Sequence, residues 1–308
     1  MRRTEHEIVV AAPADTVYQL IADVQRWPQL FPPTIHVEHV DRGEREERIR
    51  IWATANGEPK SWVSRRMLEP DHRRINFQQE VSTPPVASMG GAWVIEPRSD
   101  SESRVRLLHE YRSVGDDPDG LAWIDRAVDG NSRAELAALK ESIELAHGPD
   151  ELAFSFEDTV RVNGSVKDVY DFVNEADRWP ERLPHVARVV LTEDAPGLQC
   201  LEMDTRAVDG STHTTKSYRV TLPHRVIAYK QVTLPALMKL HAGWWTFREE
   251  DGAVLATSAH TVVLNAGNVP RILGEQATVG AARAYVHNAL STNSRTTLEH
   301  AKAYAEER

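Results

Sequence analysis

Alternation of hydrophobic and polar residues is the main pattern along the chain. Residues 5–11 alternate in this way and predict a first strand, and about six further alternating segments follow it. Turn signals such as Asn56-Gly57 separate these segments. Near position 120 the period changes, and Ile124, Val128 and Leu139 recur at helical spacing. The pattern predicts an antiparallel sheet followed by a long helix.

The same order of elements occurs a second time. Residues 17–32 (VYQLIADVQRWPQLFP) align without gaps with 169–184 (VYDFVNEADRWPERLP), and six of the sixteen positions are identical. An Asn-Ser-Arg triplet at 131–133 recurs at 293–295, ten residues later than the first register predicts. Similarity that keeps its order along the chain indicates an internal duplication. The second copy has extra residues before its last helix.

Each copy predicts one strand, two short helices, six strands and a long closing helix. This order favours an α+β fold, in which a curved antiparallel sheet wraps around its long C-terminal helix. A bent sheet that grips one helix leaves a cavity between them, where a ligand would bind. We predict two domains, residues 1–148 and 150–308, because the segment His147-Gly148-Pro149-Asp150 breaks the first long helix.

Composition narrows the function classes. The 308 residues are 41% hydrophobic and 27% charged, which is enough apolar material for two cores. A net charge of −10 argues against nucleic acid as a partner, since phosphate binding needs clustered basic residues. No apolar run approaches the roughly 20 residues that span a bilayer. Cys200 is the only cysteine, so a reducing cytoplasmic location fits. The scattered histidines predict no metal site.

Candidate chemistry appears in the segment Trp62-Val63-Ser64-Arg65-Arg66. Alternate residues of a strand share a face, so Trp62, Ser64 and Arg66 would present an aromatic wall, a hydroxyl and a cation together. The alternative is that these three face solvent and that Arg65 points inward. The second copy places Ser217 and Arg219 at the same spacing, with a threonine instead of the tryptophan.

With these residues the chain resembles the aromatase/cyclases of bacterial type II polyketide synthases, members of the helix-grip superfamily. The resemblance covers the whole chain. It rests on Trp27-Pro28, on Trp62-Val63-Ser64-x-Arg66, on Met89 with Trp93 four residues later, and on Asn131-Ser132-Arg133. Two tandem copies resemble the didomain subclass, which acts on first-ring formation with C7–C12 regiochemistry.

The resemblance implies two tandem helix-grip domains and a cofactor-independent enzyme. Such an enzyme directs the aldol cyclisation, the dehydrative aromatisation, or both, of a poly-β-ketone bound to an acyl carrier protein. An arginine stays protonated and cannot act as a base, but it can hold a carbonyl oxygen. The implied catalytic residues are Arg66, Ser64, Arg219 and Ser217. Trp62 and Met89 are implied to bind substrate.

The two copies differ at several expected substrate contacts. Where single-domain relatives have a pocket tyrosine, this chain has Thr34, and in the second copy His185 lies next to the matching position. His241 replaces Met89 and Tyr229 replaces Phe77. Trp27 either anchors the core or contacts the substrate. The alternative function is that of a non-catalytic carrier of a lipid, a quinone or another apolar ligand.

Overall fold

A computed structural model describes residues 1–146, 152–206, 210 and 212–308 of the chain. The chain forms two compact units, residues 1–149 and 150–308. The predicted linker at 147–150 lies outside the described residues, so the exact domain boundary stays a prediction. No helix of the described ranges is long and apolar enough to cross a membrane.

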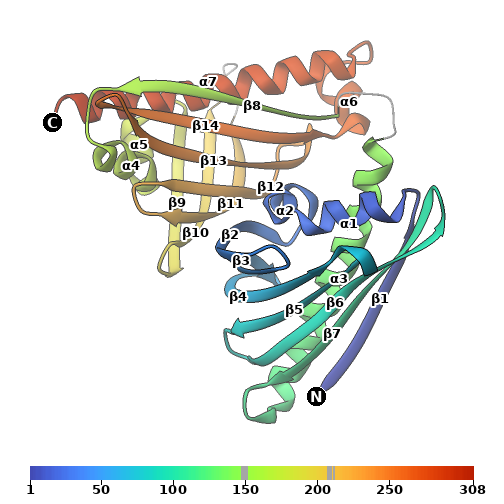
Figure 1. The fold of residues 1–308 in the computed structure, drawn as a ribbon. Coiled ribbons are helices and arrows are strands. Elements are labelled where there is room, and N and C mark those ends of the chain that lie inside the picture. Colours follow the sequence, from blue (N-terminus) through green and yellow to red (C-terminus); the bar gives the residue numbers. More distant parts are fainter. Residues whose placement is uncertain (147–151, 207–209, 211) are drawn as a thin grey trace. The chain divides into compact units, whose positions relative to one another are not determined.

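The first unit is an antiparallel sheet with the strand order β1-β7-β6-β5-β4-β3-β2 (Figure 1). Its strands are β1 (Arg2–Val10), β2 (Thr34–Arg42), β3 (Glu46–Ala55), β4 (Glu58–Glu69), β5 (Arg74–Val81), β6 (Val86–Ser99) and β7 (Glu102–Ser113). Its helices are α1 (Ala14–Ala22), α2 (Trp27–Leu30) and α3 (Pro118–Ala146), with 3-10 turns η1 (Val24–Arg26), η2 (Pro70–His72) and η3 (Val114–Asp116).

The second unit repeats this order as β8-β14-β13-β12-β11-β10-β9. Its strands are β8 (Ala153–Val162), β9 (Val186–Ala195), β10 (Leu198–Arg206), β11 (Thr212–Leu222), β12 (Val226–Thr233), β13 (Met238–Glu250) and β14 (Ala253–Leu264). Its helices are α4 (Val166–Asn174), α5 (Trp179–Arg182), α6 (Val269–Leu273) and α7 (Val279–Glu306), with η4 (Ala176–Arg178) and η5 (Ala266–Asn268). The predicted extra residues before the last helix form α6 and the turn that leads to α7, while η5 corresponds to η3 of the first unit.

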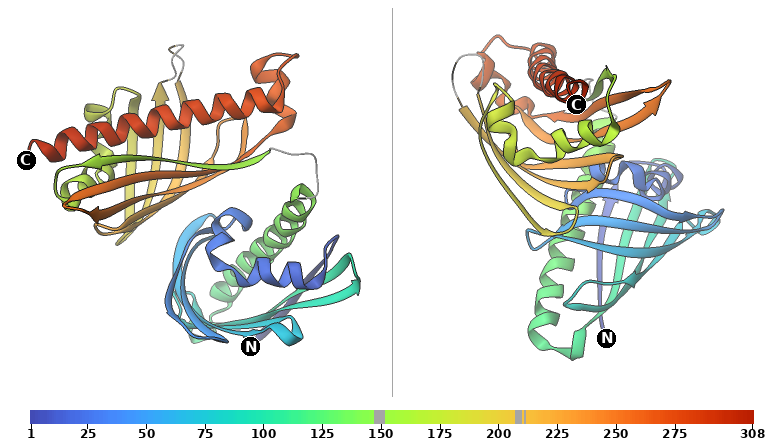
Figure 2. Two further views of the ribbon diagram at one scale, coloured as in Figure 1. Left: turned by 45° about the horizontal axis from the view of Figure 1, so that its top comes forward. Right: turned by 90° about the vertical axis from the view of Figure 1, so that its left-hand side faces the viewer.

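Each long helix lies along the concave side of its own sheet (Figure 2). The apolar face predicted for α3 is confirmed, because Ile124, Val128 and Leu139 are all buried. Leu139 joins the main core of the first unit, while Ile124 and Val128 pack with Met89 and Tyr111 nearer the other end of the helix. The predicted α+β arrangement of two tandem sheet-and-helix domains is therefore confirmed.

Local sequence explains the turns and the tight bends. Asn56 and Gly57 both have positive φ, 52° and 80°, which is the backbone a two-residue hairpin requires. Gly243 of β13 allows a close approach, since a Cβ there would lie 2.1 Å from the Ala259 carbonyl oxygen and 2.6 Å from the Tyr229 hydroxyl. Gly91 has the same role in the first unit. The glycines let the ring at position 77 or 229 lie flat across the neighbouring strand.

Candidate active site

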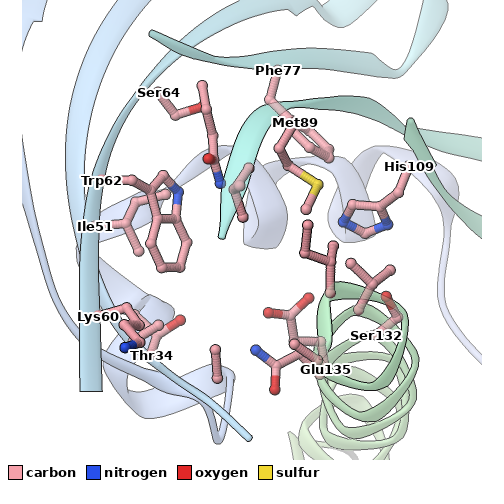
Figure 3. Close-up of a pocket in the computed structure, with 18 of the residues that line it drawn as sticks. Thr34, Ile51, Lys60, Trp62, Ser64, Phe77, Met89, His109, Ser132 and Glu135 are labelled. Atoms are coloured by element: carbon pink, nitrogen blue, oxygen red, sulfur yellow. The ribbon is translucent and has the colours of Figure 1, made fainter. Parts of the chain in front are cut away.

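An internal cavity of about 160 Å³ lies between the concave sheet face and α3 in the first unit. Most of its wall is apolar and aromatic, contributed by residues such as Trp62, Phe77 and Met89. Figure 3 shows Trp62 and Lys60 of β4 across the cavity from Ser132 and Glu135 of α3. A cavity with apolar walls and few polar groups is the usual form of a small-molecule site.

The candidate residues of β4 share the inner face of the strand. Trp62, Ser64 and Arg66 all line the cavity. Arg65 points to the opposite side, is half exposed, and pairs with Glu80 at 2.7 Å. The alternative that Arg65 faces inward is therefore wrong. Ser64 Oγ donates a hydrogen bond to the Gln78 carbonyl oxygen at 3.3 Å, so its hydroxyl proton is already engaged.

Arg66 is almost fully buried, and several of its N–H groups are engaged by protein. Nη1 donates to Glu47 Oε1 at 2.6 Å and to the Ala22 carbonyl oxygen at 3.2 Å. Nη2 donates to the Ile21 carbonyl oxygen at 3.0 Å. Burial lowers the pKa of Arg66 to about 10, and the Glu47 carboxylate opposes this shift. Arg66 is therefore a protonated group whose charge is balanced by Glu47, and it also caps the C-terminal end of α1.

Trp27 is a core anchor that also lines the cavity. Its indole Nε1 donates to the Ile21 carbonyl oxygen at 3.0 Å, and its ring packs edge-on against Phe31. The Arg66 guanidinium lies 5.0 Å from the Trp27 ring centroid. Trp27 also reaches the cavity wall, as does the buried Thr34. The core anchor and the candidate substrate contact are one side chain.

His109 of β7 is a cavity residue that the sequence reasoning missed. Its ring packs edge-on against Phe77, with ring centroids 5.4 Å apart. Burial lowers the pKa of His109 to about 4, so the imidazole is neutral at pH 7. Its Nδ1 has no hydrogen-bond partner among the residues that the structure describes. The 152-residue offset of the sequence aligns His109 with Thr261, and only the strand registers of the structure match His109 to His260.

In the second unit Arg219 repeats the position of Arg66 without its carboxylate. Gln199 lies opposite Arg219 across the strand pair, where the first unit has Glu47 opposite Arg66. Arg219 Nη2 donates to the Val173 carbonyl oxygen at 2.8 Å, while Nη1 has no partner within the described ranges. Burial lowers the pKa of Arg219 to about 10, so it still carries a proton at pH 7. The second unit therefore holds a buried cation that no carboxylate contacts directly in the described structure.

The remaining candidates of the second unit lie at three places. Ser217 is buried on β11, two residues before Arg219. Tyr229 and His241 lie together, with the Tyr229 hydroxyl 3.3 Å from His241 Nε2. His185 lies in the turn before β9, where burial and the neighbouring His300 of α7 lower the pKa of His185 to about 4. The structure thus brings Tyr229 and His241 into one cluster.

Two curved sheets, each closed by a long helix and one enclosing an apolar cavity, define a tandem helix-grip protein. The family described as polyketide cyclase / dehydrase and lipid transport matches residues 1–144 and 153–306. The chain belongs to this family. The predicted resemblance to didomain aromatase/cyclases is confirmed by solved di-domain structures of that class, which match nearly the whole chain.

Named relatives match nearly the whole chain. A granaticin polyketide synthase bifunctional cyclase/dehydratase from Streptomyces virginiae is 57% identical and covers 96% of this chain and 97% of its own. An actinorhodin polyketide synthase bifunctional cyclase/dehydratase from Streptomyces coelicolor is 45% identical, covering 98% and 96%. The crystal structure of the di-domain ARO/CYC BexL from the BE-7585A biosynthetic pathway is 63% identical, with a TM-score of 0.91 and full coverage of both chains.

Proposed function

We propose that this chain closes the first ring of a poly-β-ketone by C7–C12 aldol cyclisation and then aromatises that ring by loss of water. The chain is a polyketide cyclase/dehydratase, since relatives of that name match it at 57% and 45% identity over nearly all of its length. The regiochemistry, the carrier-bound form of the substrate and the role of each residue belong to the proposal.

The cavity of the first unit is the observation that supports this function most strongly. A poly-β-ketone has acidic methylenes between its carbonyls and cyclises in several ways in water. Walls such as Trp62, Met89 and Phe77 would hold the chain in one bent conformation, so that a single pair of carbons approaches. Thr34 and Trp27 would contact the same chain from the floor of the cavity. Confinement of this kind selects one ring among several.

Proton transfer in the first unit is assigned to His109. An aldol closure breaks one C–H bond, forms one C–C bond and converts a carbonyl into an alcohol, so one proton moves from carbon to oxygen. A neutral imidazole with a free nitrogen can accept that proton and return it. Arg66 would hold the attacked carbonyl oxygen with the N–H groups that Glu47 and α1 leave free, with Ser64 beside it.

Charge stabilisation in the second unit is assigned to Arg219. Its positive charge is buried, has no directly bound carboxylate among the described residues, and keeps Nη1 without a partner. A preorganised cation in a dry interior stabilises an oxyanion far more than the same group in water. Arg219, with Ser217 beside it, would hold the enolate oxygen that forms when the ring loses water. His185 would contact the substrate at the other end of this unit.

The partner and the location complete the proposal. An acyl carrier protein would deliver the substrate, as the resemblance implies, and the reaction would take place in the cytoplasm. The competing function of an apolar-ligand carrier is not favoured, because the relatives that match this chain along its length are named as cyclase/dehydratases.

Reconstitution of a minimal polyketide synthase tests the proposal. The synthase is run with and without a ketoreductase, and with and without this chain, and products are separated and weighed by mass spectrometry. We expect the chain to replace a mixture of spontaneous products by one product with an aromatic first ring. If the product changes only when the ketoreductase is present, the substrate is a reduced poly-β-ketone. If it changes without the ketoreductase, the substrate is unreduced. An unchanged product mixture in both settings would refute the activity.

A further inference from the structure

Four polar side chains of the second unit meet on the concave side of its sheet. Tyr229 of β12, His241 of β13, and Ser258 and His260 of β14 form this group, which we call the histidine relay. The two imidazoles are joined by a contact of 3.0 Å between His241 Nε2 and His260 Nδ1. The Tyr229 hydroxyl lies 2.8 Å from His260 Nδ1, and Ser258 Oγ lies 3.1 Å from His260 Nε2. The members bond to one another in a continuous chain.

The relay occupies positions that line the cavity in the first unit. The strand registers place Tyr229, His241 and His260 where the first unit has Phe77, Met89 and His109. Where the first unit has two apolar residues and one histidine, the second unit has a tyrosine and two histidines. Arg219 lies directly opposite Tyr229 on the adjacent strand. The second unit therefore has a buried cation on β11 and a hydrogen-bonded histidine pair on β13 and β14, with Tyr229 of β12 between them.

Proton counting gives the relay two equivalent arrangements. Both imidazoles are neutral, because burial lowers the pKa of His260 to about 4 and that of His241 well below its usual value. In one arrangement His241 Nε2–H donates to His260 Nδ1, and His260 Nε2–H donates to Ser258. In the other every donor and acceptor is reversed, so that Ser258 donates to His260 and His241 Nδ1 carries a proton. The Tyr229 hydroxyl stays protonated, since burial raises its pKa, and it lies 2.8 Å from His260 Nδ1 and 3.3 Å from His241 Nε2.

One end of the relay is open. His241 is only 3% exposed, so water cannot readily reach its Nδ1. This nitrogen is buried and has no hydrogen-bond partner in the part of the chain that the structure describes. In the first arrangement this nitrogen is a free base, and in the second it is a free acid. A buried polar atom without a partner is unfavourable unless a ligand supplies one. The open end is therefore where a substrate would meet the relay.

We infer that the histidine relay is the acid–base centre for dehydration in the second unit, with His241 as the catalytic residue and His260 as its positioning residue. The inference rests on the proposed function. In the step, His241 Nδ1 takes a proton from the carbon next to the ketone of the cyclised β-hydroxy ketone while His241 Nε2 gives its proton to His260 Nδ1, and Arg219 holds the resulting enolate oxygen. The C=C bond then forms as the C–O bond breaks, His241 Nδ1 gives its proton to the leaving hydroxyl, and the proton on His260 Nδ1 returns to His241 Nε2. The products are the unsaturated ring and one water, and the relay returns to its first arrangement.

The charges around the relay are compatible with this cycle. Asp158 of β8 raises the pKa of His260 and His287 of α7 lowers it, so the two influences oppose each other. Phe156 of β8 stacks on the His260 ring with centroids 4.8 Å apart and keeps that face apolar. His260 is therefore neutral at pH 7 before the step, and its Nδ1 is available to accept a proton from His241.

The test uses variants that the fold already accepts. Met89 and Phe77 occupy the matching positions of the first unit, so His241→Met and Tyr229→Phe copy a packing that this fold supports. His260→Gln keeps a hydrogen-bond partner for His241 Nε2 but cannot transfer a proton between two nitrogens. His260→Leu removes both functions. His72→Gln, at an exposed histidine of η2, is the matched control.

Each variant is assayed in the reconstituted synthase for the ratio of dehydrated to hydrated ring product, which differ by one water in mass. We expect His241→Met to lower this ratio about 100-fold while the total of cyclised product is kept, because positioned acid–base groups contribute about 10²–10⁴-fold. His260→Gln should lower the ratio and leave the thermal unfolding temperature unchanged. A purely structural His260 would instead be rescued by glutamine and not by leucine.

The outcomes separate this inference from the proposed function. If the parent chain yields no cyclised product, both are overturned. If cyclised product forms and the ratio is the same for His241→Met, His260→Gln and the His72→Gln control, the relay is not the dehydration centre and the proposed activity stands.

Discussion

Replacing Glu47 with glutamine removes the carboxylate that balances the buried Arg66 guanidinium. Arg66 and Glu47 side chains are 1% and 3% exposed, and their closest atoms are 2.6 Å apart. Breaking a buried ion pair at one partner costs about 3–5 kcal/mol. The glutamine oxygen can still accept the Arg66 hydrogen bond, and the second unit tolerates Gln199 opposite Arg219. We therefore expect the lower end, about 3 kcal/mol, which corresponds to about 6–12 °C in the unfolding temperature of a unit of this size.

Calorimetry of the full chain measures this change. The transition of the first unit should move to lower temperature, and that of the second unit should stay in place. Glu46→Gln is the matched control, because Glu46 pairs with Arg65 at 3.3 Å where both side chains are about half exposed. Such a surface pair contributes about 0–1 kcal/mol. Equal shifts for Glu47→Gln and Glu46→Gln would show that the charge of Arg66 is not balanced by Glu47.

Three further predictions concern the buried cations, the neutral histidines and the close glycine. Arg219→Met should leave the unfolding temperature unchanged or raise it while slowing aromatisation about 100-fold. Arg66→Met should instead lower the unfolding temperature, because it leaves the buried Glu47 carboxylate without its ion-pair partner. Calorimetry and product analysis compare the two variants. His109 and His260 have pKa values lowered to about 4 in the fold, so the unfolded chain binds more protons between about pH 6.5 and pH 4. The free energy of unfolding should therefore fall as pH drops through this window, by about 3 kcal/mol for each histidine, and urea titrations at several pH values measure it. Gly243→Ala should destabilise the second unit by about 1–3 kcal/mol, since its Cβ would overlap a strand carbonyl and a tyrosine hydroxyl; urea unfolding checks this, and a shift within error of the parent would contradict it.

Local pattern was sufficient for the fold and for which residues of β4 share one face. The duplication, the Asn56-Gly57 hairpin and the helical spacing of α3 all depend on short-range signals, and the structure agrees with each. Trp62, Ser64 and Arg66 share one face because alternation on a strand is strict, and the structure shows that this face lines the cavity. These features need no knowledge of which strands are neighbours.

Long-range pairing explains what the sequence did not reveal. Glu47 belongs to a Glu-Glu-Arg segment that is typical of a solvent-exposed strand, yet it is buried and contacts Arg66 of β4 and His39 of β2. His109 and His260 look isolated in the sequence, and only the register of neighbouring strands brings His109 to Phe77 and His260 to His241. The difference between Arg66 and Arg219 likewise depends on the residue opposite each arginine.

The regiochemistry of the first ring is the central claim, and labelling measures it most directly. A minimal synthase supplied with uniformly ¹³C-labelled malonyl units is run with and without this chain, and the carbon–carbon couplings of the product are read by NMR. We predict that the chain gives one product in which C7 and C12 are directly bonded within an aromatic ring. A product whose first ring joins any other pair of carbons, or couplings that are the same with and without the chain, would contradict the account.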